Sequence, residues 1–386
     1  VIYGMSGEPR GSRVLETLLR ISPDEVYNKI IEKGAFVESL QDYVEHDVSN
    51  FVIQTVLNTV RTNEQAEALL QGLEKLMLSG YIVDSKNRRG SVLWRAFELA
   101  ADRKLRQEDL LKAMRIGMGV IANKSSGESG EPDDSGDAKK KKKKMRQKAL
   151  AIPLKDCVAP LLKIQPPESD GARVFLDVES CRLIHHMMRF TPNLIEDLLD
   201  GIVTRLSMEE LEWIAKDGLG SLCIIDGILE GPMGEPVFSR AAKKLLERLS
   251  GRWVPLACDR VGHHSVQKLF KALPNLDDKA TLTAELAKGS NRLGGNSMGR
   301  SIIEVCHVHA FQESQESWSA AIRRVDDDIK WLDELENEPV NNNDSSSKKK
   351  RKRKRKSNDD GIKDVEKKPK PSAVAAIVDT IMNAAS

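Results

Sequence analysis

The sequence lacks the features of a membrane protein. No apolar run reaches the roughly 18 residues that a membrane-spanning helix requires. No signal peptide is visible at its start, so we expect no association with a membrane. The first residue is Val1 rather than Met, and we expect the chain to be part of a longer protein.

The cysteines and histidines also lack the spacing of a metal site. No Cys-x-x-Cys pair occurs among the five cysteines, which are Cys157, Cys181, Cys223, Cys258 and Cys306. An odd count without close spacing argues against a disulfide framework and a structural zinc site, and it favours a reduced intracellular compartment. Adjacent histidines, as in His185-His186 and His263-His264, point about 100° apart on a helix. We therefore expect no metal and no cofactor.

Motifs of enzymatic chemistry are missing as well. Residues 294–299 (GGNSMG) resemble a phosphate-binding loop in their glycines, but no strand precedes them and no Gly-Lys-Ser/Thr ending follows. No motif places a nucleophile, a base and an orienting group together. We therefore predict no catalytic residues and no enzymatic activity.

The charge of the chain is unevenly distributed. The net charge is +2, but residues 123–150 carry +4 and residues 338–371 carry +7, which leaves −9 on the rest. Both basic stretches have too few apolar residues to offset chain entropy, so we expect a disordered lysine-rich insert and a disordered basic tail. Residues 372–386 hold a short apolar stretch that is compatible with a terminal helix.

The basic tail contains an uninterrupted run of nine cationic side chains. Its members are Lys348, Lys349, Lys350, Arg351, Lys352, Arg353, Lys354, Arg355 and Lys356. Such density is typical of nuclear or nucleolar targeting signals, and it also binds nucleic acid without sequence preference. We predict a location in the nucleus and nucleolus.

The remaining segments are predicted to be helical. Residues 67–78 and 239–253 both repeat apolar residues with a period near 3.6. Proline opens several expected helices, at Pro23, Pro192 and Pro274, where its missing N–H costs nothing. Alternating strands are absent from the pattern. The predicted fold class is therefore all-α.

A six-residue pattern recurs seven times along the chain. It consists of a small or turn residue, two variable residues, two apolar residues and a polar residue. The seven instances begin at Gly11, Ser49, Gly90, Ser180, Gly220, Gly262 and Gly299.

The spacing of this motif predicts an α-solenoid. Its second positions are 12, 50, 91, 181, 221, 263 and 300, so the steps lie near 40 residues except for one of 90 that contains the predicted insert. A second marker agrees, because proline falls eleven residues after four of these positions, at Pro23, Pro192, Pro232 and Pro274. A period near 40 with two or three helices per unit is typical of HEAT, armadillo and Pumilio repeats.

The motif itself resembles the Pumilio (PUF) repeat, whose inner helix carries a Gly-Asn-Tyr-Val-Ile-Gln-like sequence. Residues 49–57 (SNFVIQTVL), 11–19 (GSRVLETLL) and 262–270 (GHHSVQKLF) are similar to it. The resemblance implies a curved array whose second and sixth motif positions contact the edge of one base while the third stacks between bases. Residues i and i+4 share one helix face, which is compatible with that arrangement. The two apolar positions between them are expected to point into the core.

The family resemblance assigns base contacts motif by motif. Ser12, Arg13 and Glu16 resemble its guanine-type reading, and Asn50, Phe51 and Gln54 resemble its uracil-type reading. The fifth motif (Ser221, Leu222, Ile225) has lost the polar sixth residue. The other implied contacts are less specific: Ser91, Arg95, Cys181, Arg182, His185, His263, His264, Gln267, Arg300, Ser301 and Glu304.

The repeat length and the basic segments narrow the resemblance to a divergent nucleolar branch of the Pumilio family. That branch implies an RNA-binding scaffold of small-subunit ribosome biogenesis, with the pre-18S ribosomal RNA precursor and pre-ribosomal particle proteins as partners, acting as a monomer on nuclease processing. The expected organisation is repeats over 1–122, insert over 123–150, repeats over 151–337, tail over 338–371 and a terminal helix in 372–386.

A protein-binding, HEAT-like adaptor in nuclear assembly or transport is the alternative, and the −9 charge of the rest of the chain favours it. The position of the basic residues beside the motifs discriminates between the two functions. An RNA-binding face requires them to gather on the motif helices.

Overall fold

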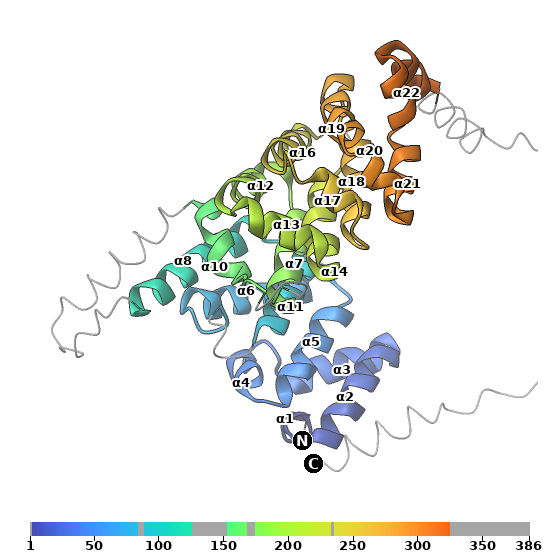
Figure 1. Ribbon diagram of the computed structural model, residues 1–386. Coiled ribbons are helices and arrows are strands. Elements are labelled where there is room, and N and C mark those ends of the chain that lie inside the picture. Colours follow the sequence, from blue (N-terminus) through green and yellow to red (C-terminus); the bar gives the residue numbers. More distant parts are fainter. Residues whose placement is uncertain (1, 84–88, 126–152, 168–173, 233–234, 325–386) are drawn as a thin grey trace, which may run out of the picture. The chain divides into compact units, whose positions relative to one another are not determined.

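The computed structural model describes residues 2–83, 89–125, 153–167, 174–232 and 235–324 (Figure 1). Most of the predicted insert, the basic tail with Lys348–Lys356, and residues 372–386 lie outside these ranges. The chain forms two compact units, Val1–Trp318 and Ser319–Ser386. The described part of the first is almost entirely helical, with an isolated bridge between Gln165 and Phe175. The predicted all-α fold is confirmed.

Each of the seven repeats contributes a helix that carries the motif and a third helix, and six of them also have a described short first helix. The described first helices are α1 (Ile2–Gly7), α4 (Leu40–Glu45), η2 (Leu154–Cys157) with α10 (Val158–Leu162), α13 (Met208–Lys216), α17 (Trp253–Ala257) and α20 (Ser290–Gly294). The motif helices are α2 (Pro9–Ile21), α5 (Ser49–Thr59), α7 (Gly90–Arg103), α11 (Val178–Met188), α14–η3–α15 (Gly218–Gly220, Ser221–Ile225 and Asp226–Leu229), α18 (Gly262–Ala272) and α21 (Ser297–Val305). The third helices are α3 (Asp24–Gly34), α6 (Asn63–Leu78), α8 (Gln107–Ser125), α12 (Pro192–Arg205), α16 (Pro236–Arg248), α19 (Leu276–Lys288) and α22 (Val308–Glu313).

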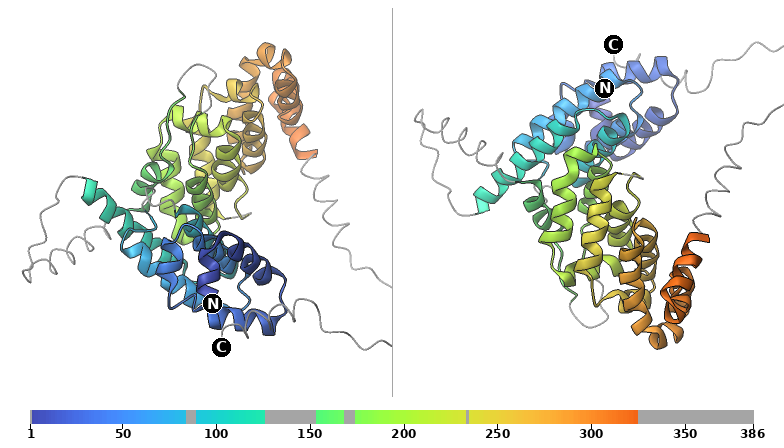
Figure 2. Two further views of the ribbon diagram at one scale, coloured as in Figure 1. Left: turned by 90° about the horizontal axis from the view of Figure 1, so that it is seen from below. Right: turned by 90° about the horizontal axis from the view of Figure 1, so that it is seen from above.

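The motif helices pack against one another in chain order (Figures 1 and 2). Helix α7 lies directly against α11, and the ring of its Phe97 stacks on Phe190, just beyond the end of α11, with centroids 5.4 Å apart. The 90-residue step between these two motifs is therefore one interrupted repeat, as predicted from the period.

Local sequence signals set the ends of the helices. All four periodic prolines fall where a motif helix gives way to the third helix: Pro23 precedes α3, Pro192 opens α12, Pro274 lies just before α19, and Pro232 lies between α15 and α16. At α13, the side chain of Ser207 accepts from the backbone N–H of Glu210, and Glu210 accepts in return from the Ser207 N–H.

The predicted apolar faces form the core, with two differences. In α6, Leu69, Leu70, Leu73 and Met77 are buried, while Leu76 is half-buried. The segment 239–253 is two helices rather than one, because α16 ends at Arg248 and a turn with Gly251 at φ 85° leads into α17 at Trp253. No helix in the described ranges is both long and apolar enough to cross a membrane.

Arginine side chains join consecutive repeats at helix ends. Arg61 donates to the carbonyl of Ser22 at 2.5 Å, Arg103 to that of Val60 at 2.9 Å, and Arg248 to that of Leu206 at 2.6 Å. Each acceptor is the residue that caps the C-terminus of a helix. The carbonyls there lack helical partners and carry partial negative charge, so a cation stabilises them.

The first position of the motif is a close contact between two backbones. A Cβ on Gly11, Gly220, Gly262 or Gly299 would lie less than 3.0 Å from the carbonyl oxygen six residues earlier, on Met5, Ile214, Leu256 or Leu293. The motif helix thus begins directly against the first helix of its own repeat. Glycine permits this approach because it has no side chain.

We predict that Gly299→Ala destabilises the solenoid by about 1–3 kcal/mol, because the added methyl overlaps the Leu293 backbone. Gly294→Ala is the matched control, since a Cβ at Gly294 meets nothing within 4 Å. The control should be neutral or slightly stabilising. Thermal unfolding followed by circular dichroism measures both, and equal melting temperatures would contradict the close-contact explanation.

Candidate nucleic-acid interface

The side chains at the second, third and sixth positions of the seven motifs make up what we call the motif face. Its third positions are the most exposed. Arg13, Arg182 and His264 are exposed, Phe51 is 48% exposed, and Leu222 is 60% exposed. Two third positions differ, since Val92 is buried and Ser301 is half-buried. Phe51 and Leu222 are the apolar members of this exposed set, and they lie in the second and fifth repeats.

The second positions are mostly buried at the start of the motif helix. Ser12 is 3% exposed and donates to the Pro9 carbonyl at 3.1 Å, while Ser221 is hydrogen-bonded across to Ser265 at 3.0 Å. Cys181 lies in the core, where burial raises the pKa of its thiol to about 12. Small, neutral side chains here let the helix start against its neighbour.

The Asn50 and Gln54 side chains are joined by a hydrogen bond, as their i and i+4 spacing allows. The Asn50 amide donates to the carbonyls of His46 and Asp47 at 3.1 and 2.7 Å, and its oxygen accepts from Gln54 Nε2 at 3.0 Å. Asn50 therefore fixes the orientation of the Gln54 amide. Phe51 stands exposed beside this pair.

Glu16 is a buried carboxylate between two arginines. It is 4% exposed, and its Oε2 lies 3.5 Å from both Arg13 and Arg20. Its Oε1 accepts no hydrogen bond from the described part of the chain. A buried oxygen with an unused lone pair is a costly arrangement unless another donor supplies the bond.

The contact between α7 and α11 already uses its polar side chains. Ser91 donates to Glu179, while Arg95 donates to Glu98 at 2.6 Å and to Asn58 at 3.1 Å. The Arg95 guanidinium also lies 3.8 Å from the centroid of the Trp94 ring, with Arg182 5.0 Å from the same ring. Of the residues predicted at this junction, Arg182 is exposed, while His185 is half-buried and its buried Nδ1 has no hydrogen-bond partner among the described residues.

The sixth and seventh motifs are linked by polar contacts. The rings of His263 and His264 lie 3.8 Å apart at 39°. Gln267 donates to Ser301 at 3.1 Å, and Arg300 donates to the Gly294 carbonyl at 3.2 Å. Glu304 is exposed. In the described part of the chain no group of three His, Cys, Asp or Glu side chains is arranged to hold a metal ion.

The fifth motif departs from α-helical geometry. Residues Ser221–Ile225 form a π-helical turn, closed by a bond from the Asp226 N–H to the Ser221 carbonyl. Such a turn accommodates one extra residue. The position after Ile225 is Asp226, which is 6% exposed and bonded to Lys268 at 2.6 Å. The sequence pattern stopped at Ile225 and missed this carboxylate, although the following 42-residue step is the longest of the uninterrupted repeats.

A cavity of about 590 Å³ opens between this turn and α18. The lining includes motif residues from both repeats, together with Asp226 and Lys268: Ser221, Leu222, His263 and His264. Burial alone would lower the pKa of Lys268, but hydrogen bonds to Asp226 and Glu230 outweigh it and raise that pKa. Burial also lowers the pKa of His264, and His263 and Lys268 lower it further.

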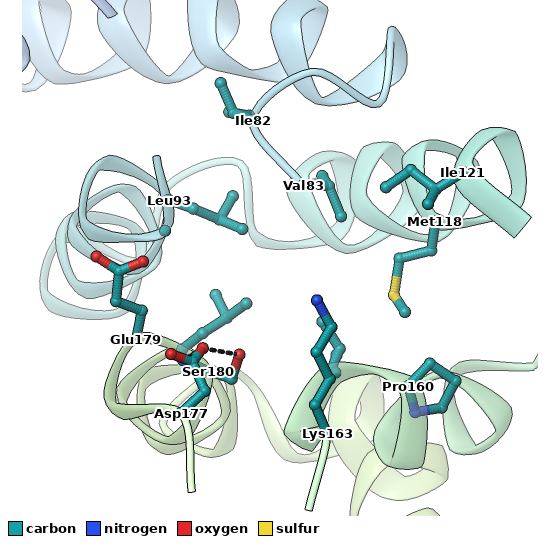
Figure 3. Close-up of a pocket in the computed structure, with 13 residues that line it drawn as sticks. Ile82, Val83, Leu93, Met118, Ile121, Pro160, Lys163, Asp177, Glu179 and Ser180 are labelled. Carbon is teal, nitrogen blue, oxygen red and sulfur yellow. Dashed lines mark hydrogen bonds between the residues drawn. The ribbon is translucent and has the colours of Figure 1, made fainter. Parts of the chain in front are cut away.

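A second cavity, of about 310 Å³, lies between the third and fourth repeats (Figure 3). Its wall is largely apolar, with Leu93, Met118 and Ile121 on one side and Pro160 on the other. Asp177 caps α11 at its edge by accepting from the Ser180 backbone N–H at 3.0 Å, and it also accepts from the Ser180 hydroxyl. None of the residues predicted to contact a base lines this cavity.

The basic residues beside the motifs include both enclosed and exposed side chains, and the exposed Arg13 is also paired, with Glu16. Arg89, Arg95 and Lys268 are paired with acidic residues of the chain. Those that are exposed on or beside the motif helices are Arg13, Arg182, Arg260, Arg292 and Arg300. They lie in the first, fourth, sixth and seventh repeats, so the motif helices carry a positive charge that the −9 total does not reveal.

Comparison with known proteins agrees with the stacked motif helices and defines the class as a PUF-repeat solenoid. The chain belongs to the family of NOP9-like PUF repeat domains, which it matches over residues 1–301. It is 28% identical to nucleolar protein 9 of Schizosaccharomyces pombe over 153 aligned residues. These residues make up 39% of this chain and 23% of the Schizosaccharomyces pombe protein. The predicted resemblance to the nucleolar branch is confirmed.

Solved structures share the fold. The structure of APUM23 with GGAUUUGACGG matches with a TM-score of 0.62 at 16% identity. The match covers 83% of this chain and 54% of the APUM23 chain. The structure of APUM23 lacking its insert region, with GGAAUUGACGG, has a TM-score of 0.61 at 16% identity. The match covers 83% of this chain and 56% of that APUM23 chain. The chain thus spans about a quarter of the curated relative and about half of these solved chains.

The neutral state of His186, next to the motif face, makes stability depend on pH. Burial lowers its pKa to about 4, with the positive charges of His185 and Arg189 adding to the effect, and its ring stacks on Trp94 with centroids 5.5 Å apart. Between an unfolded pKa near 6.5 and the folded value, the unfolded state holds more protons. Acid therefore favours unfolding in this window.

We predict that lowering the pH from 7.5 to 5.0 costs the protein about 2 kcal/mol through this group. His186→Phe keeps a flat ring on Trp94 and removes the titration. Urea unfolding at both pH values measures the free energy of unfolding. Its decrease between pH 7.5 and pH 5.0 should be about 2 kcal/mol smaller in the variant than in wild type. The same pH dependence in both proteins would contradict this assignment.

Proposed function

We propose that this chain binds single-stranded RNA along the motif face, on the concave side of the solenoid, and that its target is the precursor of small-subunit ribosomal RNA. The observation that carries the proposal is the row of exposed third-position side chains, Arg13, Phe51, Arg182, Leu222 and His264. These flat or long side chains lie on the first, second, fourth, fifth and sixth repeats, and each offers a stacking surface for one base.

The sixth positions support base reading at the N-terminal end. Glu16 has an unused acceptor, which suits the N–H groups of guanine, and Gln54 is held in place by Asn50. The exposed arginines supply phosphate contacts that are independent of sequence. This predicts firm reading at the first two motifs, and looser reading at the α7–α11 junction, where polar groups are already paired.

The cellular setting rests on the relative. Nucleolar protein 9 of Schizosaccharomyces pombe is named for the nucleolus, and the Lys348–Lys356 run suits a nuclear or nucleolar address. We infer a monomeric, non-enzymatic scaffold within pre-ribosomal particles, whose occupancy of the RNA limits access by processing nucleases.

A protein-binding adaptor remains the second candidate, favoured by the −9 charge outside the basic segments. The two functions make opposite demands on the motif face. RNA requires stacking side chains and exposed cations together on that face, whereas the adaptor function makes use of the acidic charge.

We predict that Phe51→Ala weakens binding of short single-stranded RNA by roughly 5- to 100-fold, because one base loses its stacking partner. Fluorescence anisotropy with a labelled random-sequence RNA measures the affinity. The change should leave folding intact, since Phe51 is 48% exposed.

Val37→Ala is the matched control, because Val37 is also an exposed apolar residue, at 37%, but lies outside the motif helices. It should bind RNA like wild type. If both variants bind RNA as tightly as wild type, the motif face is not the RNA-binding surface.

A further inference from the structure

The fifth motif has the composition of a degraded repeat, but its backbone suggests otherwise. In an α-helix, the second and sixth positions share a face because four residues make about one turn. A π-turn, which is closed by a bond from residue i+5 to residue i, inserts one extra residue, so the fifth residue along takes the place that the fourth has in an α-helix. The bond from the Asp226 N–H to the Ser221 carbonyl is of this wider kind. Asp226 therefore takes the place on the helix face that Ile225 would occupy.

The resulting triplet matches the first motif. Ser221, Leu222 and Asp226 correspond to Ser12, Arg13 and Glu16: a buried serine, an exposed third side chain and a buried acid. The likeness extends to individual atoms. Asp226 Oδ1, like Glu16 Oε1, is buried and accepts no hydrogen bond from any described residue.

The groove beside Asp226 is built to receive a flat polar group. Leu222, 60% exposed, and the exposed His264 both line the cavity of about 590 Å³. Lys268 stands at its base, 2.6 Å from Asp226 Oδ2 and 2.9 Å from Glu230 Oε1. A lysine ammonium has three N–H donors, so these two bonds leave one for a ligand.

We propose that the fifth motif reads a guanine through Ser221, Leu222 and Asp226, with Lys268 as the second polar contact. The Watson–Crick edge of guanine presents one acceptor, O6, beside two donors, N1–H and the 2-amino group. Asp226 Oδ1 accepts from the donors, and the third N–H of Lys268 reaches O6. Leu222 and His264 cover the two faces of the base. Adenine presents a different order of donors and acceptors and leaves the carboxylate without its bonds.

This inference rests on the proposed RNA binding and adds a specific base to it. If each repeat takes one base, the first and fifth motifs select guanines separated by three intervening bases. The wild-type chain, incubated with a random pool of short single-stranded RNA, should therefore enrich this spacing. Sequencing of the bound fraction reads it out.

Asp226→Asn tests the reader directly. It should lower the preference for guanine at one position by roughly tenfold and leave the other positions unchanged. Glu209→Gln is the control, since it removes the charge of an exposed acidic residue on α13 of the same repeat that does not line the cavity. The control should keep the wild-type preference.

Replacing each selected guanine by inosine tests the same contact from the RNA side, without altering the fold of the protein. Loss of the 2-amino group should weaken wild-type binding several-fold at the Asp226 position. If wild type selects a sequence but neither Asp226→Asn nor inosine changes a single position, the inference fails and RNA binding stands. If wild type binds no RNA, both fail together.

Discussion

The close approach of two backbones at the start of the motif helix governs the architecture of four repeats. At Gly11, Gly220, Gly262 and Gly299, the motif helix begins so close to the first helix of its repeat that no side chain would fit between them. This contact fixes the rotation of the helix about its axis. The second position is then enclosed, the fourth and fifth mostly enter the core, and the third points outward. The arginine clamps at helix ends join one repeat to the next.

The repeat architecture could be predicted from the sequence because it depends on periodic features. Motif spacing and proline positions are properties of the chain itself, and the interrupted repeat followed from the same period. Exposure within the motif was harder to predict. The fourth and fifth positions were expected in the core, yet Val14 is 44% exposed while Leu15 is buried, because contacts across neighbouring repeats decide how far each turn is covered.

The chemistry of the motif face depends on residues far apart in sequence. Ser91 is occupied by Glu179 and Arg95 by Glu98 and Asn58, which no motif comparison reveals. Asp226 was missed for a different reason: a π-helical turn changes which residues share a face, and a count of four residues fails there. The signal available in the sequence was the 42-residue step that follows the fifth motif, which is the longest of the uninterrupted repeats. Buried acids with an unused oxygen, at Glu16 and Asp226, emerge only from the three-dimensional contacts.

We propose that the motif side chains read RNA, rather than charge alone holding it. Crosslinking with sequencing of bound RNA tests this proposal most directly, using wild type and the variant Ser12→Ala/Glu16→Ala/Asn50→Ala/Gln54→Ala. The control variant changes four exposed polar residues on the third helices α3 and α6: Asn28, Glu32, Glu64 and Gln71. We predict that the motif variant loses the sequence preference of its RNA sites while the control keeps it. Unchanged sites and occupancy in the motif variant would contradict base reading by these repeats.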